Sequence, residues 1–266
     1  MRRGDRARMI NVTIETAHGS TRWRGPVLGA DNLRTLQVVV AMAGTAKYGQ
    51  LTISARPETD EGCLLRRALR FAPPETPLTG AAVQCTWGDI LRESGQANTG
   101  GNFRRLRESL ERLEMMIVRA TIKKDGVEHE AGFSLLGWRR VGDRLGIALN
   151  PTLAEAVLGE DARFCRIELH EIRRLKTEAG RLIHQRLCAI QNQGTDRNWK
   201  ADTLATYIWP EHKTAGPAAK RQHLTRLRQA VGDLRGAGWA AAAIPGGYTI
   251  TRPARREVPA PSQTAS

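Results

Sequence analysis

The chain has 266 residues, which is enough for two modest domains, and its 41 Lys and Arg residues against 27 Asp and Glu residues give a formal net charge of +14. This excess favours a polyanionic partner, because neutralising phosphates releases counterions, although charge alone does not decide between nucleic acid and an anionic membrane surface. No apolar run approaches the roughly 20 residues needed to span a bilayer, and the apolar segment after the basic N-terminus is too short for an export signal, so we expect a cytoplasmic protein with no membrane partner.

In chain order, residues 1–27 predict a basic N-terminal arm and a strand, because Ile10, Val12 and Ile14 alternate with polar residues. The next segment predicts a helix, for which Asp31 is the candidate N-terminal cap. A strand, a short basic helix and a proline-rich loop are then expected at residues 51–55, 63–70 and 73–77.

A helix-turn-helix pattern comes next. Thr86-x-x-Asp89 has the spacing of a capping box and opens a short helix at residues 87–93. After a turn, a longer helix carries an apolar stripe on one face and basic residues on the other. Such a helix suits a protein core on one side and phosphates on the other.

A hairpin is predicted directly after this basic helix. Residues 116–123 and 130–136 predict its two strands, and Asp125-Gly126 is a strong signal for a two-residue turn. This hairpin would be the wing of a winged-helix domain, with Lys123 and Lys124 at its tip. The alternative is that these lysines only protect an exposed hairpin from pairing with other strands.

The second half of the chain repeats this order. A strand at 144–149 and a helix that starts at Asn150-Pro151 complete the first half. A strand, a long helix, a short helix, a basic helix and a hairpin are then predicted at residues 165–169, 178–191, 201–208, 218–235 and 239–251. The remaining residues are rich in Pro, Ala, Ser and Arg, which favours a disordered tail.

An internal duplication supports this division. The apolar stripe of the first basic helix recurs at a constant offset, as Phe103, Leu106, Leu110 and Leu113 and then as Leu224, Leu227, Val231 and Leu234. The tripeptide Arg105-Leu106-Arg107 recurs at the same phase as Arg226-Leu227-Arg228. We therefore predict an α+β protein of two tandem winged-helix domains related by internal duplication. The predicted segments are an N-terminal arm and strand, domain 1, domain 2 and a tail, at residues 1–27, 28–160, 161–252 and 253–266.

Both basic helices are expected to enter the major groove of double-stranded DNA, where Arg pairs with guanine and Gln with adenine. The expected DNA-binding residues lie on the two helices and at the first wing: Arg104, Arg105, Arg107, Glu108, Arg112, Lys123, Lys124, Arg221, Gln222, Thr225, Arg226, Arg228 and Gln229. The second helix is the better base reader, because in the first Arg104 can pair with Glu108 and Arg107 with Glu111 on a merely solvated face.

The sequence contains no recognisable catalytic pattern. It has no Walker sequence for nucleotide hydrolysis and no His-x-His pair of the kind used by a nicking enzyme. Its cysteines lie far apart, with no Cys-x-x-Cys pair and no His at ligand spacing, so we expect buried free thiols at Cys63, Cys85, Cys165 and Cys188. His184 lies near the inward face of its helix and is expected to be a packed histidine. We expect no enzymatic activity, no metal and no cofactor.

Several segments resemble the RepC-type replication initiators of IncQ-like broad-host-range plasmids. They are Leu28-Gly29-Ala30-Asp31, Leu33-Arg34, Leu36-Gln37, Ala41-Met42-Ala43-Gly44, Leu149-Asn150-Pro151, Arg181-Leu182, His184-Gln185-Arg186-Leu187-Cys188, Trp209-Pro210, Gly238-Trp239 and Ile250-Thr251-Arg252-Pro253. The resemblance implies two tandem winged-helix domains that bind direct repeats, called iterons, in a plasmid origin. It also implies opening of a neighbouring AT-rich segment and recruitment of the plasmid's helicase and primase. The chain differs from the family in its short N-terminal arm and its longer tail.

Two other classes of function use the same fold. A transcriptional repressor or plasmid-partition factor would bind an operator without opening an origin, and a scaffold would use its basic faces to recruit other replication proteins. Because the two domains are similar, unequal and joined in a fixed order, a directional repeat is the expected site. A homodimer or an array along the DNA is the expected assembly.

Overall fold

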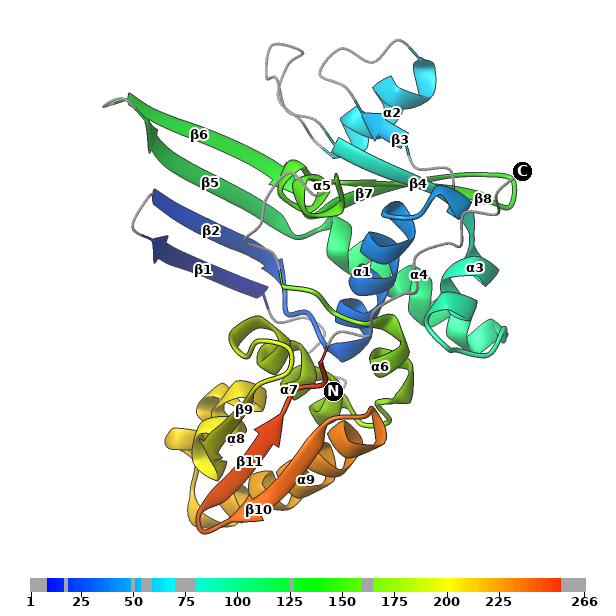
Figure 1. The fold of residues 1–266 in the computed structure, drawn as a ribbon. Coiled ribbons are helices and arrows are strands. Elements are labelled where there is room, and N and C mark those ends of the chain that lie inside the picture. The colour runs from blue at the N-terminus through cyan, green and yellow to red at the C-terminus, as the bar shows by residue number, and fades with distance from the viewer. Residues whose placement is uncertain are drawn as a thin grey trace, which may run out of the picture. The chain divides into compact units, whose positions relative to one another are not determined.

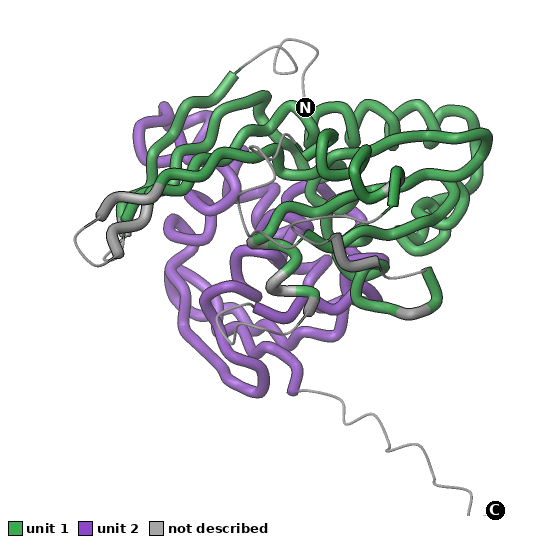
Figure 2. The backbone as a smooth tube through the Cα atoms, turned by 90° about the horizontal axis from the view of Figure 1, so that it is seen from above, with its two compact units in different colours: residues 1–164 green, residues 165–266 purple. Residues whose placement is uncertain are grey.

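The computed structural model describes residues 9–16, 19–48, 51–53, 59–69, 80–124, 127–158 and 165–254. The chain divides into two compact units, residues 1–164 and residues 165–266 (Figure 2). Each unit combines helices with antiparallel sheet, in agreement with the predicted α+β class. The sequence analysis placed this division after residue 160. The predicted turn Asp125-Gly126 and most of the predicted tail lie outside the described residues.

The helices of unit 1 follow the predicted order. They are α1 (Ala30–Ala43), α2 (Asp60–Ala68), α3 (Trp87–Glu93), α4 (Gly100–Glu114) and α5 (Pro151–Leu158), with a short 3-10 helix, η2 (Ala46–Tyr48), after α1. The predicted cap of α1 is wrong by two residues: Gly29 is the N-cap, because the side chain of Asn32 accepts a hydrogen bond from the Gly29 amide at 2.8 Å.

The described part of unit 1 contains two antiparallel sheets of four strands each. One runs β1-β2-β5-β6, formed by β1 (Met9–Thr16), β2 (Gly19–Pro26), β5 (Ile117–Lys124) and β6 (Val127–Ser134). The other runs β3-β4-β8-β7, formed by β3 (Leu51–Ile53), β4 (Gly80–Thr86), β8 (Arg144–Leu149) and β7 (Leu136–Val141). The predicted hairpin is therefore present as β5 and β6, and it forms one half of a larger sheet (Figure 1).

Three of these strands, β2, β4 and β7, were not predicted. The sequence analysis expected one strand in residues 1–27, whereas β2 folds back on β1 and pairs through Arg22, Trp23 and Arg24 with β5. The N-terminal segment is thus part of the sheet of unit 1, and β2 was missed because only Trp23 gives it an apolar signal. β4 was also missed, since its sequence begins with small residues that show no alternation.

Unit 2 is built from helices around a three-stranded sheet. Its elements are α6 (Leu169–Arg174), α7 (Glu178–Ile190), β9 (Asp196–Lys200), α8 (Ala201–Ile208), the 3-10 helix η3 (Pro210–Lys213), α9 (Pro217–Gly236), β10 (Ala240–Ile244) and β11 (Gly247–Thr251). The sheet order is β10-β11-β9. The predicted strand at 165–169 is wrong, because residues 165–168 have no regular structure and α6 starts at Leu169.

Both units contain a helix, a short helix, a long basic helix and a hairpin in that order, but their sheets differ. In unit 2 the strand before the short helix, β9, pairs with β11, the return strand of the hairpin. In unit 1 the strand before the short helix, β4, pairs with β8 and belongs to a different sheet from the hairpin. None of the helices in the described part of the chain combines the length and apolarity needed to cross a membrane.

Candidate nucleic-acid interface

The orientation of α9 is fixed by an apolar stripe. Leu227, Val231 and Leu234 are buried in the core of unit 2, and Leu224 packs against that core. Pro217 lies in the first turn of α9, and its fixed backbone angle suits the start of a helix. Proline has no amide hydrogen, and in the first turn that hydrogen would have no acceptor within the helix. With one face buried, helical geometry turns the opposite face to solvent.

The predicted base-reading residues of α9 all lie on that solvent face. The exposed residues are Arg221, Gln222, Thr225, Arg226, Arg228 and Gln229. Among the residues that the structure describes, Arg221, Arg226 and Arg228 make no ion pair, so their guanidinium groups can pair with phosphates or guanine without first breaking one. The Thr225 hydroxyl donates its hydrogen to the Arg221 carbonyl at 3.0 Å. While that bond lasts, Thr225 offers DNA its methyl group and its oxygen lone pairs.

The corresponding face of α4 is less open. Arg104, Arg105 and Arg107 are exposed, but Arg107 Nε lies 2.9 Å from Glu111 Oε1, which is the ion pair that the solvated-face alternative predicts. Glu108 and Arg112 are half-buried. The guanidinium of Arg112 donates to the backbone carbonyl of Val27, in the segment between β2 and α1.

Arg112 therefore differs from the other predicted DNA-binding residues, because its guanidinium holds part of unit 1 together. The sequence pattern places Arg112 on the basic face, but it contains no information about a carbonyl 85 residues away. Lys123 and Lys124 end β5, as predicted, and their side chains lie outside the described residues.

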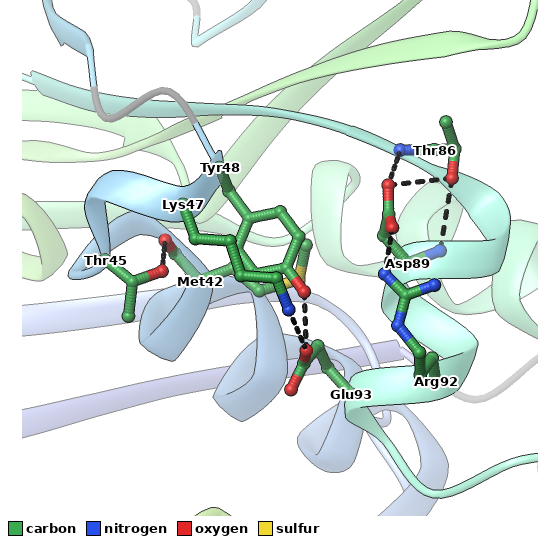
Figure 3. Close-up of polar contacts among 8 residues, drawn as sticks. All are labelled: Met42, Thr45, Lys47, Tyr48, Thr86, Asp89, Arg92 and Glu93. Carbon is green, nitrogen blue, oxygen red and sulfur yellow. Dashed lines mark hydrogen bonds and ion pairs between the residues drawn. The ribbon is translucent and has the colours of Figure 1, made fainter.

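The short helix α3 is fixed at both ends by polar contacts (Figure 3). At its start, Asp89 accepts from the Thr86 amide at 2.8 Å while the Asp89 amide donates to the Thr86 hydroxyl at 3.2 Å, which confirms the predicted capping box. At its end, Glu93 accepts from the Tyr48 hydroxyl and from Lys47. Burial raises the pKa of Asp89, but the hydrogen bonds from Thr86 and Arg92 outweigh it, so the pKa lies below the ordinary value.

A histidine bridge joins α8, η3 and α9 in unit 2. His212 Nε2 lies 3.1 Å from Asp202 Oδ1, and His212 Nδ1 lies 3.1 Å from His223 Nδ1. The His223 ring also stacks on Trp209, with ring centroids 4.6 Å apart. Burial lowers the pKa of His223, as do the electrostatic effects of His212 and then Arg226, and Glu211 opposes them. Sequence reasoning missed this bridge, because the spacing of the two histidines matches no known motif.

A second buried polar cluster joins α6, α7 and the hairpin of unit 2. Glu171 Oε2 lies 2.6 Å from His184 Nε2 and accepts from the Trp239 indole at 3.0 Å, and Cys188 Sγ lies 3.6 Å from His184 Nε2. Burial raises the pKa of Glu171, but the hydrogen bonds from His184 and Trp239 outweigh this effect. The pKa of Glu171 therefore lies below its ordinary value, which favours the carboxylate.

These side chains include three metal-ligand types, Glu171, His184 and Cys188, whose ligand atoms lie within 4.8 Å of one another. The spacing His184-x-x-x-Cys188 corrects the expectation that no cysteine has a histidine at ligand spacing. Burial raises the pKa of Cys188 to about 12, which disfavours the thiolate that a metal needs, and Glu171 already accepts two hydrogen bonds. The donor set therefore fits a hydrogen-bonded core cluster better than a metal site. The expectation of buried thiols holds for Cys85 and Cys188 and is wrong for the exposed Cys63 and Cys165.

The model of the family "Replication protein C (RepC)" matches residues 1–254 of this chain. The chain belongs to the RepC family. Two solved structures with a similar fold are crystal structures of domains 2 and 3 of RctB. The first has a TM-score of 0.57 at 10% identity and covers 92% of this chain and 91% of its own. The second has a TM-score of 0.56 at 9% identity, with coverages of 91% and 89%. A search of curated proteins gives no match.

Several residues in the segments that carry the RepC resemblance cap helices or lie in cores. Gly29 is the N-cap of α1, and Asn150 binds the Leu135 carbonyl and the Leu153 amide, each at 3.0 Å, at the start of α5. Arg252 is buried and donates to the carbonyls of Cys188 and Gln191 at 2.7 and 2.8 Å. These residues of the resembling segments maintain the fold.

The histidine bridge gives the RepC chain a dependence of stability on pH. In the folded chain the pKa of His223 is lowered from its ordinary value of about 6.5. When the pH falls below that value, His223 takes up a proton in the unfolded chain but remains neutral in the folded chain, so protonation favours unfolding. The contribution of His223 is therefore fully present above that pH and is lost as the pH falls towards its folded pKa. We expect a lower free energy of unfolding at about pH 5.5 than at about pH 7.5 in urea titrations.

A His223→Gln variant should show a smaller difference between the two pH values than the wild type. His170→Gln is the matched control, because it removes an exposed histidine of α6 that takes no part in the bridge. An equal pH difference in His223→Gln and the wild type would contradict the role given to the bridge.

Proposed function

We propose that the chain is a replication initiator that binds directly repeated sequences in the duplex DNA of a replication origin. The observation that carries this proposal is the solvent face of α9, where three arginines and two glutamines lie opposite a buried apolar stripe. These arginines form no ion pair with any residue that the structure describes. Membership of the RepC family supports the replication role, and the net charge of +14 supports a nucleic-acid partner.

Each unit is proposed to act as a winged-helix domain, with its long basic helix in a major groove and its hairpin against the backbone. The shared order of helix, short helix, basic helix and hairpin supports this interpretation. The duplication would then have diverged, since the hairpin of unit 1 joins β2 whereas that of unit 2 joins β9. Unit 2 would carry most of the base readout, because α4 has an internal ion pair and a partly engaged Arg112.

The later steps of the proposal come from the family resemblance. Binding to several repeats would strain the origin and favour opening of a neighbouring AT-rich segment, where weak base steps deform most easily. The plasmid's helicase and primase would then be recruited. A homodimer or an array along the DNA would occupy the repeats. No residue described above is assigned to these steps.

Arg226 is the sharpest test of base readout. Arg226→Ala should cost about 1 to 3 kcal/mol of binding free energy on the preferred duplex and relax the preference at one base pair, because a bidentate contact to guanine is lost. Lys124→Ala should instead weaken binding to all duplexes alike, as expected for a phosphate contact at a wing. Anisotropy titrations on native and scrambled duplexes measure both effects. Equal losses on the two duplexes for Arg226→Ala would remove Arg226 from base readout.

Footprinting on the native replicon distinguishes the proposed function from its rivals. An initiator should protect a tandem array of repeats beside an AT-rich tract. Protection of one operator at a promoter would instead support a transcriptional repressor or partition factor. Weak binding with no sequence preference would support a scaffold that recruits other replication proteins.

The proposal gives the chain no catalytic step. The purified protein should therefore neither hydrolyse ATP nor cut DNA, with phosphate release and supercoiled-plasmid nicking as the two assays. Magnesium-dependent strand cleavage, or ATP hydrolysis that copurifies with the protein through successive columns, would contradict this part of the proposal.

A further inference from the structure

One face of the sheet β1-β2-β5-β6 carries three exposed arginines. The antiparallel register places Arg22 of β2 directly opposite Arg119 of β5, and Arg24 lies two residues further along β2. Because side chains alternate between the faces of a strand, all three share one face. None of them lies on a helix that the sequence analysis singled out, and β2 was not predicted as a strand.

The direct pairing of Arg22 with Arg119 opposes their positive charges. Like charges at facing positions of neighbouring strands destabilise a sheet, so such a pair needs a compensating partner. Among the side chains that the structure describes, the same face has two carboxylates. One is Glu15, which lies opposite Ser20, and the other is Glu130, whose Oε1 lies 3.5 Å from Arg119 Nη1. Both carboxylates lie in the next row of the sheet, towards the far end of the hairpin. The rows that hold the three arginines contain no acidic residue.

Neighbouring residues keep this arginine surface open and oriented. Arg22 Nε donates to Asn11 Oδ1 at 2.8 Å, which fixes the guanidinium and leaves its two terminal nitrogens available. Gly132 of β6 is the cross-strand partner of Arg119. Because Gly132 has no side chain, the Arg119 side chain can lie over β6 at this position. An extended surface of exposed guanidinium groups is suited to phosphate oxygens, which accept two parallel hydrogen bonds from arginine.

The opposite face of the same sheet has a different character. Trp23 lies there, opposite Val12 and Val118. The described part of the arginine face therefore offers no aromatic ring on which an unpaired base could stack, and stacking is the usual basis of single-strand binding. This contrast favours the backbone of duplex DNA over single-stranded DNA as the occupant.

We propose that Arg22, Arg24 and Arg119 form a second DNA-binding surface of unit 1, which contacts backbone phosphates of duplex DNA and reads no bases. This inference rests on the proposed function, since it requires a duplex partner. It assigns the N-terminal strands a part in binding, alongside α4 and the hairpin. On binding, a phosphate replaces Glu130 as the counter-charge of Arg119.

The test is a salt series on a double variant, Arg22→Gln with Arg24→Gln. Anisotropy titrations use an origin duplex and a scrambled duplex of equal length. Each lost phosphate contact lowers the slope of log K against log salt by about 0.9, so the double variant should lose about 1.8 from the slope. Affinity should fall by the same factor on both duplexes, because backbone contacts carry no sequence information.

The matched control is Arg140→Gln with Arg144→Gln. Both arginines are exposed on β7 and β8 of the other sheet of unit 1, and the control removes the same charge. It should keep the wild-type slope. An unchanged slope in the Arg22/Arg24 variant, or an equal loss in the control, would overturn the inference. Circular dichroism checks folding, and Arg119→Gln provides a second variant that should lower the slope by about 0.9.

The same titrations separate this inference from the proposed function. If the wild type prefers the origin duplex and the Arg22/Arg24 variant keeps the wild-type slope, only the inference fails. If the wild type shows no preference but the variant still loses slope on both duplexes, the sequence-specific initiator fails and the phosphate surface stands. A loss of affinity confined to a single-stranded oligonucleotide would overturn the assignment to duplex DNA.

Discussion

The burial of one apolar stripe determines what α9 can present to a partner. Leu227, Val231 and Leu234 are almost completely excluded from solvent in the core of unit 2, and a helix cannot rotate without exposing them. Removing three such side chains from the core would cost several kcal/mol, which is a large part of the stability of a small unit. The arginines and glutamines on the opposite face are therefore held towards solvent by packing, and the binding proposal depends on that rigidity.

The helices could be predicted from the sequence because their signals are local. Apolar spacing, the Thr86 capping box and Asn150 with Pro151 lie within a few residues of the structure that they specify. The missed strands have only nonlocal signals. β2 has one aromatic residue among polar ones, and β9 has only Trp199 buried, with an indole that donates to Gln191. Their partners lie elsewhere in the chain, and an isolated segment does not reveal them.

In the candidate site, too, local features could be predicted from the sequence and contacts between distant residues could not. Helical geometry predicted which residues of α9 face solvent, because that depends only on the apolar stripe. Helical geometry could not predict that Arg112 binds the carbonyl of Val27, between β2 and α1. Nor could it predict that His212 of η3 and His223 of α9 form a bridge. The family pattern was no guide to these contacts either, since residues such as Arg252 secure the core.

The most direct test of the central claim is a crystal structure of the chain bound to a duplex that carries one repeat. The account predicts that α9 lies in a major groove, with Arg226 and at least one of Gln222 and Gln229 within hydrogen-bond distance of base edges. A complex in which the solvent face of α9 points away from the DNA, while other surfaces make the contacts, would contradict it.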